Sequence, residues 1–309
     1  MFLFILFLTS LNLKSEEIKT IRAEEIWTIK NTGPKPYLSP DGSYVAWTKS
    51  TETEEDRFNE KIYIAKVGTE ERIEIGKTKE LFGWLNNEYL ITQEGFLSIK
   101  ERKLFKKIEN IPEIIIKRAD LIIPVNINLD KIEKIHPFWV IKNGEIRKVY
   151  STGEPYNFVL FVDKSEIQRI ILFQNGIPLY VNTKSRNNFV FGFIPSPLQD
   201  KFILRFFSEG IVIFPNENRI YSLPTGGSLS WSPDGKELIF ARLEDNGHFE
   251  TKGELFLCNW DGTNIRKIVF EKERIRREPS FGPPDMITYG FWDENRNLCI
   301  GVAKILRKH

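Results

Sequence analysis

The sequence is poor in the residues that usually build metal and redox sites. Its 309 residues include two cysteines, three histidines and two methionines. The histidines, His136, His248 and His309, share no metal-ligand spacing, so no metal site and no cofactor is expected. His136 precedes a proline and is expected in a loop. Cys258 and Cys299 stand in apolar runs, which favours two buried thiols; a disulfide stays open if the protein is exported.

An excess of charge of one sign is also missing. Lys and Arg number 44 and Asp and Glu 42, which leaves a net charge of +2. A nucleic-acid-binding domain would be strongly basic, so no nucleic-acid partner is expected. The basic runs at residues 100–107 and 272–277 are interleaved with apolar residues, which favours solvent-facing strand edges.

No apolar run of membrane-spanning length stands at the start of the chain. Residues 2–13 form a run that is too short for a bilayer and fits the core of a signal peptide. No Lys or Arg precedes this run and no Ala-x-Ala pattern follows it, so an uncleaved anchor or a buried first strand are the alternatives. We expect a signal peptide over residues 1–15, a periplasmic or otherwise exported protein, and no transmembrane span after cleavage.

The chain does contain a specific hairpin signal. Residues 229–242 read Leu-Ser-Trp-Ser-Pro-Asp-Gly-Lys-Glu-Leu-Ile-Phe-Ala-Arg, which is two apolar runs around a Pro-Asp-Gly turn. Gly235 can take the positive φ of a tight turn, and Asp234 can accept hydrogen bonds from the turn's own amides. Residues 37–48 repeat the device, so Asp41 and Asp234 are expected to be structural acceptors rather than a site.

Further turns recur along the chain and indicate a repeat. Residues 82–92 are a worn copy in which two asparagines replace Pro-Asp, and other turn positions bring the spacing to about 40 residues, the length of a four-stranded propeller blade. No long helical period occurs. The pattern predicts an all-β propeller with seven four-stranded blades, or six if the third and fourth units are irregular.

Two units depart from the regular pattern. The third is expected to hold strands at Glu113–Lys117, Leu121–Val125, Phe138–Lys142 and Ile146–Tyr150. The seventh lacks a fourth strand, whereas the alternating run Glu25–Lys30 has no partner in its own unit. We therefore predict that this N-terminal strand closes the ring of a single propeller domain over residues 16–309.

The best copy of the repeat carries a family resemblance. Residues 229–268 combine Ser-Pro-Asp-Gly-Lys with Leu-Phe-x-x-Asn-Trp-Asp-Gly-Thr-Asn-x-Arg-Lys-Ile, which resembles the WD40-like (PD40-type) β-propeller repeat of the TolB type. Residues 36–67 match it well. The resemblance implies a propeller fold and a role in the cell envelope. Peptidase relatives of this repeat carry an α/β-hydrolase domain, whose Gly-x-Ser-x-Gly motif does not occur in this sequence.

Two loops are candidates for partner binding. Residues 51–60 and 244–250 are insertions between the second and third strands of blades one and six, and propeller geometry places such insertions on one face. Their aromatic residues are possible apolar anchors in an acidic rim, and two plain solvated loops are the alternative. The candidate residues are Glu52, Glu54, Glu55, Asp56, Phe58, Glu244, Asp245, His248 and Phe249.

These observations lead to one expected function and to alternatives. We expect a monomeric, non-catalytic, exported propeller that acts as a protein-binding scaffold in the envelope, as in TolB-like proteins. The first alternative is a propeller lyase or hydrolase that acts on carbohydrate or peptide at the central channel, where convergent carboxylates, histidines or a metal would favour it. The second is a repeat domain that folds within a larger complex. No catalytic residue is singled out.

Overall fold

The computed structural model describes the chain from residue 19 to residue 307, apart from short internal segments. These segments are residues 51–59, 112–113, 119–131, 137, 150–158, 164–168, 175–176, 183–191, 199, 206–209, 215–218, 224–227 and 247–248. Every regular element of the described residues is a β-strand, which confirms the predicted all-β class. Within these ranges no helix is long and apolar enough to cross a membrane.

Three sheets are four-stranded antiparallel meanders in chain order. The first contains β2 (Tyr37–Leu38), β3 (Tyr44–Ser50), β4 (Glu60–Lys66) and β5 (Arg72–Thr78). The second contains β6 (Leu81–Trp84), β7 (Tyr89–Thr92), β8 (Gly95–Ser98) and β9 (Leu104–Phe105). The third of this kind contains β17 (Gly192–Pro195), β18 (Phe202–Arg205), β19 (Gly210–Phe214) and β20 (Arg219–Leu223).

The third and fourth units of the chain are less regular. One sheet contains β10 (Ile114–Arg118), β12 (Phe138–Lys142) and β13 (Glu145–Val149), and the other β11 (Ile132–His136), β14 (Val159–Asp163), β15 (Arg169–Gln174) and β16 (Ile177–Asn182). β11 pairs with β14, so His136 lies in a strand, and its expected place in a loop was wrong. The expected strand Leu121–Val125 lies outside the described residues. β10 contacts β17 directly, past the sheet that lies between them in sequence.

The largest sheet joins two groups of strands through the N-terminal strand. One group is β21 (Leu229–Trp231), β22 (Glu237–Asp245), β23 (Glu250–Asn259) and β24 (Arg266–Val269); the other is β25 (Arg276–Phe281), β26 (Met286–Trp292) and β27 (Leu298–Leu306). β1 (Lys19–Ile29) pairs in parallel with β24 through its first four residues and antiparallel with β27 from Arg22 to Ile29. It begins earlier than the predicted strand because its first residues pair with the preceding group.

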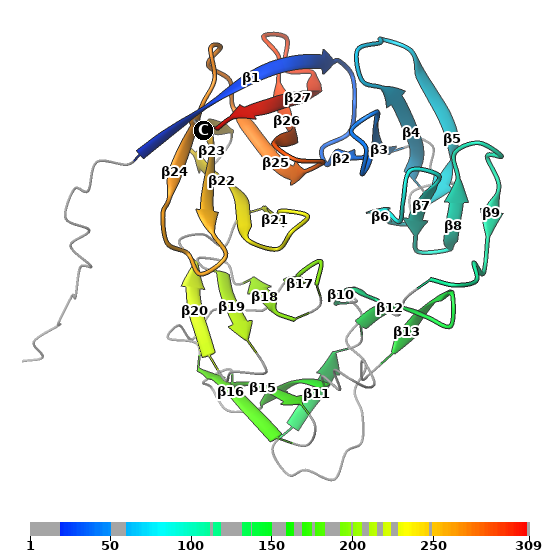
Figure 1. The fold of residues 1–309 in the computed structure, drawn as a ribbon, viewed down its shortest axis with the longest axis vertical. Helices are drawn as coiled ribbons and strands as arrows, with labels where there is room; N and C mark the ends of the chain where they lie inside the picture. Colours follow the sequence, from blue (N-terminus) through cyan, green and yellow to red (C-terminus); the bar gives the residue numbers. More distant parts are fainter. Residues whose placement is uncertain are drawn as a thin grey trace, which may run out of the picture.

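The sheets follow one another around a common centre, with β6, β10, β17 and β21 nearest to it (Figure 1). Successive antiparallel sheets in a ring are the architecture of a β-propeller. The fold class of this chain is therefore a β-propeller.

The repeated turns form as their residue types predict. The Ser39 hydroxyl donates to Asp41 at 2.6 Å, and the Ser232 hydroxyl donates to Asp234 at the same distance. Each carboxylate also accepts a backbone N–H two residues later. Gly235 has a φ of +67°, which a side chain would strain. The aspartates are thus structural acceptors, as predicted.

Indole groups connect neighbouring sheets near the centre of the ring. Trp231 of β21 donates through Nε1 to the carbonyl of Ile194 on β17 at 3.2 Å. Trp84 of β6 donates in the same way to the carbonyl of Tyr37 on β2 at 2.9 Å. The two tryptophans that align in the repeat therefore do the same work at two sheet junctions.

The core is divided among the sheets and their junctions. Trp27 and Ile29 of β1 pack with Leu38, Val45 and Trp47 of the first sheet, so the N-terminal strand also contacts a third group of strands. Both cysteines are buried free thiols, which confirms that reading. Burial raises the pKa of the Cys258 thiol to about 12.

Candidate functional site

The tip of the β22–β23 hairpin presents an aromatic side chain to solvent. Asp245 pairs with Glu250 across the hairpin, and Asn246 closes it, because its N–H donates to the Phe249 carbonyl at 3.1 Å and its side-chain oxygen accepts the Phe249 N–H at 2.9 Å. The Phe249 side chain is nevertheless 58% exposed. The guanidinium of Arg296 lies 4.5 Å from its ring centroid. The tip is thus a held turn that presents an aromatic ring beside a cation.

Arg296 comes from a second element, the turn between β26 and β27. Its φ of +60° is unusual for a residue with a side chain. Asp293 holds this turn, since its carbonyl accepts the Arg296 N–H at 3.0 Å and its carboxylate accepts the Asn297 N–H at 2.7 Å. Residues from two neighbouring groups of strands therefore meet at Phe249.

The carboxylates next to this tip have basic partners. Lys252 lies 3.4 Å from Glu244, and Arg277 lies 3.0 Å from Glu250. The Trp292 indole donates to the same Glu250 carboxylate at 3.2 Å. The described part of the predicted rim is therefore mixed in charge.

Several predicted rim residues lie outside the described residues or carry no described side chain. The first loop, with Glu52, Glu54, Glu55, Asp56 and Phe58, lies outside, as does His248; of Asp245 only the backbone is described. Whether the two loops form one acidic rim stays a prediction. Arg296, Arg277 and Trp292 were not predicted, because they come from the next group of strands and no sequence spacing links them to residues 244–250.

A second set of charged residues consists of Lys35, which precedes β2, Arg205 at the end of β18 and Glu278 in β25. Lys35 lies 5.2 Å above the Tyr37 ring, and Tyr37 raises its pKa, with smaller contributions from Glu278 and Glu80. Burial lowers the pKa of Arg205, and Glu278 opposes that shift. Glu278 stands in a β-bulge of β25 with a φ of +45°. Bulges and strained residues are common at functional sites, which makes this set a second candidate.

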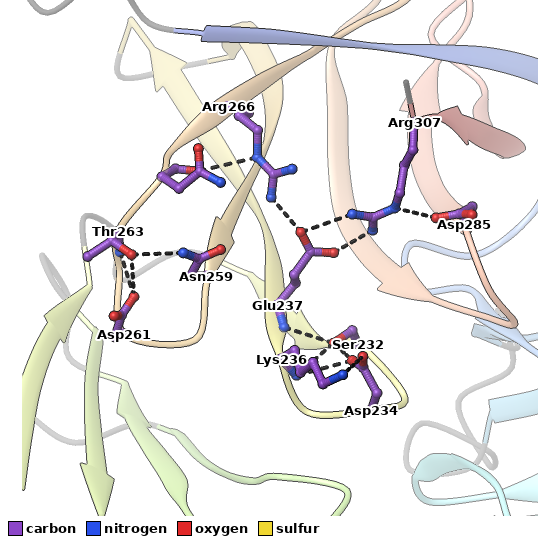
Figure 2. Close-up of polar contacts among 11 residues, drawn as sticks. Ser232, Asp234, Lys236, Glu237, Asn259, Asp261, Thr263, Arg266, Asp285 and Arg307 are labelled. Carbon is purple, nitrogen blue, oxygen red and sulfur yellow. Dashed lines mark hydrogen bonds and ion pairs between the residues drawn. The ribbon is translucent and has the colours of Figure 1, made fainter. Parts of the chain in front are cut away.

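Another dense polar cluster, the Glu237 cluster, connects the last two groups of strands (Figure 2). It consists of Glu237, Arg266, Arg307 and Asp285. Glu237, at the start of β22, binds Arg266 at 2.5 Å and also binds Arg307, which in turn binds Asp285. The two arginines lower the pKa of Glu237 against the effect of burial. Every charge in this cluster has an opposite partner, so it reads as structural. In the described ranges, no three His, Cys, Asp or Glu side chains converge as a metal ion would require.

The fold places this chain among the β-propellers, and the similarity to known proteins is one of structure. No protein-family model and no curated protein matches this chain. A chain of the crystal structure of the mitotic checkpoint complex aligns over 99% of both chains with a TM-score of 0.51 and 10% identity, a likeness of fold alone.

Two further structures are more distant. TolB from Acinetobacter baumannii is 18% identical over 81% of this chain, with a TM-score of 0.39, and this chain spans 57% of its length. The β-propeller domain of the Trilobed protease from Pyrococcus furiosus, described as having an open velcro topology, is 13% identical over 90% of this chain and 82% of its own, with a TM-score of 0.36.

Proposed function

We propose that this protein is a non-catalytic, exported β-propeller that binds a protein partner in the cell envelope. The observation that carries the proposal is Phe249, which is 58% exposed on a turn held by Asn246 and lies beside Arg296. Aromatic and arginine side chains dominate the binding energy of protein interfaces. A ring already held in place loses little conformational entropy on binding.

The finer architecture belongs to the same proposal. We propose seven blades, with β1 as the outer strand of the last blade, residues 1–15 as a signal peptide and residues 16–309 as one monomeric domain. The pairing of β1 with β27 supports the ring closure. The direct contact of β10 with β17 marks the place where the sevenfold pattern is weakest.

The proposed interface would be centred on Phe249 and Arg296. The paired carboxylates Glu244 and Glu250 would form a polar rim around the aromatic anchor. Because these pairs are at the rim, their substitution should change the association rate more than the lifetime of the complex.

The test is crosslinking capture from native envelope extract with the full chain and three variants. Phe249→Ser and Arg296→Ser each remove one part of the anchor. Leu198→Ser is the matched control, because Leu198 is also an exposed apolar residue, at 62%, but lies in a β17–β18 turn at the opposite end of the strands. A partner kept by wild type and Leu198→Ser and lost by the other two supports the proposal; equal capture by all four contradicts it.

The second candidate is a ligand or enzyme site at the central channel, favoured by the strained bulge at Glu278. A lyase or hydrolase that acts on carbohydrate or peptide would need such a carboxylate near cations like Lys35. Glu278→Gln should then abolish turnover in a screen of oligosaccharides and peptides and leave the thermal midpoint unchanged. Turnover that survives this substitution would place the chemistry elsewhere.

A further inference from the structure

A cleft of about 660 Å3 lies where β1 separates from β24. The last parallel pair joins Arg22 to Val269; beyond it β1 continues along β27, while the chain from Phe270 turns toward β25. The cleft is bordered by residues 22–25 of β1, by residues 269–272, by Arg276 and by Leu306. The cleft therefore lies between two neighbouring groups of strands, and β1 forms one of its sides.

A buried arginine, Arg276, lines this cleft. Arg276 is only 5% exposed, and its guanidinium lies 3.7 Å from the centroid of the Phe270 ring. Its Nη2 donates to the Lys272 carbonyl at 2.7 Å and its Nη1 to the Arg274 carbonyl at 3.4 Å, whereas its Nε has no hydrogen-bond acceptor among the described residues. A buried charged group with an unused donor is costly unless something compensates it.

The nearby carboxylate is already shared. Glu25 accepts from Nη1 of Arg274 at 2.8 and 3.1 Å and from the hydroxyl of Tyr289 at 2.8 Å. Tyr289 is fully buried, and its ring lies 5.3 Å from the Arg276 guanidinium. Glu25 thus already binds one guanidinium and one phenol, and Arg276 makes no ion pair with a carboxylate among the described residues.

The mouth of the cleft adds cations and apolar surface. Val269 and Leu306 are 38% and 43% exposed and flank the opening. The charged residues that line the cleft are balanced, with Arg22, Lys272 and Arg276 against Glu24, Glu25 and Glu271. Glu25 is already paired with Arg274 from outside this lining. An incoming carboxylate would therefore meet Arg276 and Lys272 beside an apolar rim.

We propose that this cleft binds a small organic carboxylate with an apolar body. The carboxylate would lie between Arg276 and Lys272, and the apolar body would cover Phe270, Val269 and Leu306. Charge-assisted hydrogen bonds to a guanidinium are among the strongest in proteins, and an apolar pocket with a few polar groups is the usual form of a small-molecule site. This inference does not depend on the proposed protein partner.

The test uses 4-phenylbutyrate as the probe and its neutral analogue 4-phenylbutyramide for comparison. Titration calorimetry on the mature chain should show saturable binding of the carboxylate and at least about tenfold weaker binding of the amide, because the amide lacks the charge. Inorganic phosphate, which has no apolar body, should also bind more weakly.

Exposed positions keep the test independent of folding. Lys272→Glu and Leu306→Glu should each weaken phenylbutyrate binding by about tenfold or more through repulsion of the carboxylate or loss of the apolar rim. Lys236→Glu is the matched control, since Lys236 is a 79% exposed lysine in a turn at the other end of the strands, and it should bind as wild type does. Absence of saturable binding, equal binding of the amide, or wild-type affinity in both cleft variants would overturn the proposal.

Discussion

At the residue scale, a serine and an aspartate build the turn that repeats along the chain. Ser232 donates to Asp234 at 2.6 Å, and Ser39 does the same for Asp41. A third pair, Ser196 and Asp200, makes the same 2.6 Å bond with a longer spacing of four residues. The sequence indicates that residues 194–200 replace the turn, but it does not predict this bond, because the Pro-Asp-Gly pattern is lost.

These pairs predict a loss of stability in acid. The Ser39 hydroxyl lowers the pKa of Asp41, and hydrogen bonds from Ser232 and the Lys236 N–H lower that of Asp234 against partial burial. A carboxyl whose pKa is lower in the folded state stabilises the fold above its unfolded pKa of about 4, and that stability disappears as the pH falls through the folded pKa. The free energy of unfolding, measured with urea from pH 7 to pH 2, should therefore fall in the acidic range.

Two serine variants test whether the Ser232 hydroxyl lowers the pKa of Asp234. Ser232→Ala removes the hydroxyl donor and should raise the pKa of Asp234 in a carboxyl NMR titration. Ser230→Ala, two residues earlier on β21, should leave it unchanged, because Ser230 makes no hydrogen bond to this carboxylate among the described contacts. The same pKa in all three proteins would contradict the role of the hydroxyl.

The indole bonds give a second prediction at this scale. Trp231→Phe keeps most of the apolar surface but leaves the Ile194 carbonyl without its donor at 3.2 Å. Loss of one such bond should lower the free energy of unfolding by about 1–2 kcal/mol. Trp84→Phe at the equivalent junction should cost a similar amount. Unchanged urea midpoints in both variants would show that these bonds do not hold neighbouring sheets together.

At the scale of elements, the sequence predicted strands well where turn residues bracket them. Asn86 does accept the N–H groups of Glu88 and Tyr89, as expected of a worn turn. β11 was missed because Ile132–His136 is short, charged and followed by proline, and only its pairing with β14 makes it a strand. Strand pairing depends on neighbours that are distant in sequence, which local patterns do not record.

The Glu237 cluster gives a prediction for the C-terminal end of the described chain. Arg307 follows β27 and binds both Glu237, which is 15% exposed, and Asp285. Arg307→Met should lower the free energy of unfolding by about 1–2 kcal/mol, because it leaves a largely buried carboxylate with one partner fewer. Lys252→Met is the control, because it removes a lysine that is 49% exposed and pairs with Glu244 at 3.4 Å and with Glu254 at 3.3 Å, and exposed ion pairs contribute little to stability. Equal changes in the free energy of unfolding for the two variants would show that the Glu237 cluster stabilises the fold no more than an exposed ion pair does.

At the scale of the whole molecule, the period of the turns was enough to predict the propeller, but not the candidate sites. Phe249 was predicted from its loop, whereas its neighbour Arg296 belongs to another group of strands. Arg276 lies in a basic run that suggested a solvent-facing edge, yet its side chain is buried. Both facts depend on how neighbouring groups of strands pack, and repetition along the chain carries no information about that contact.

The closure of the ring by β1 is the most consequential architectural proposal, and a crosslink can test it. Glu24 of β1 lies opposite Lys304 of β27, and Lys61 lies opposite Lys77 within the first sheet. A disulfide at the first pair closes a loop of about 280 residues and one at the second about 16, so loop-closure entropy favours the first by about 2–3 kcal/mol. The buried Cys258 and Cys299 should not interfere, since burial raises the pKa of both thiols.

If β1 closes the ring, the oxidised Glu24→Cys/Lys304→Cys protein should exceed the oxidised Lys61→Cys/Lys77→Cys control in thermal midpoint, and reduction should remove the difference. A midpoint at or below the control would mean that the ends of the chain separate without unfolding the blades, and the propeller would then be an open one.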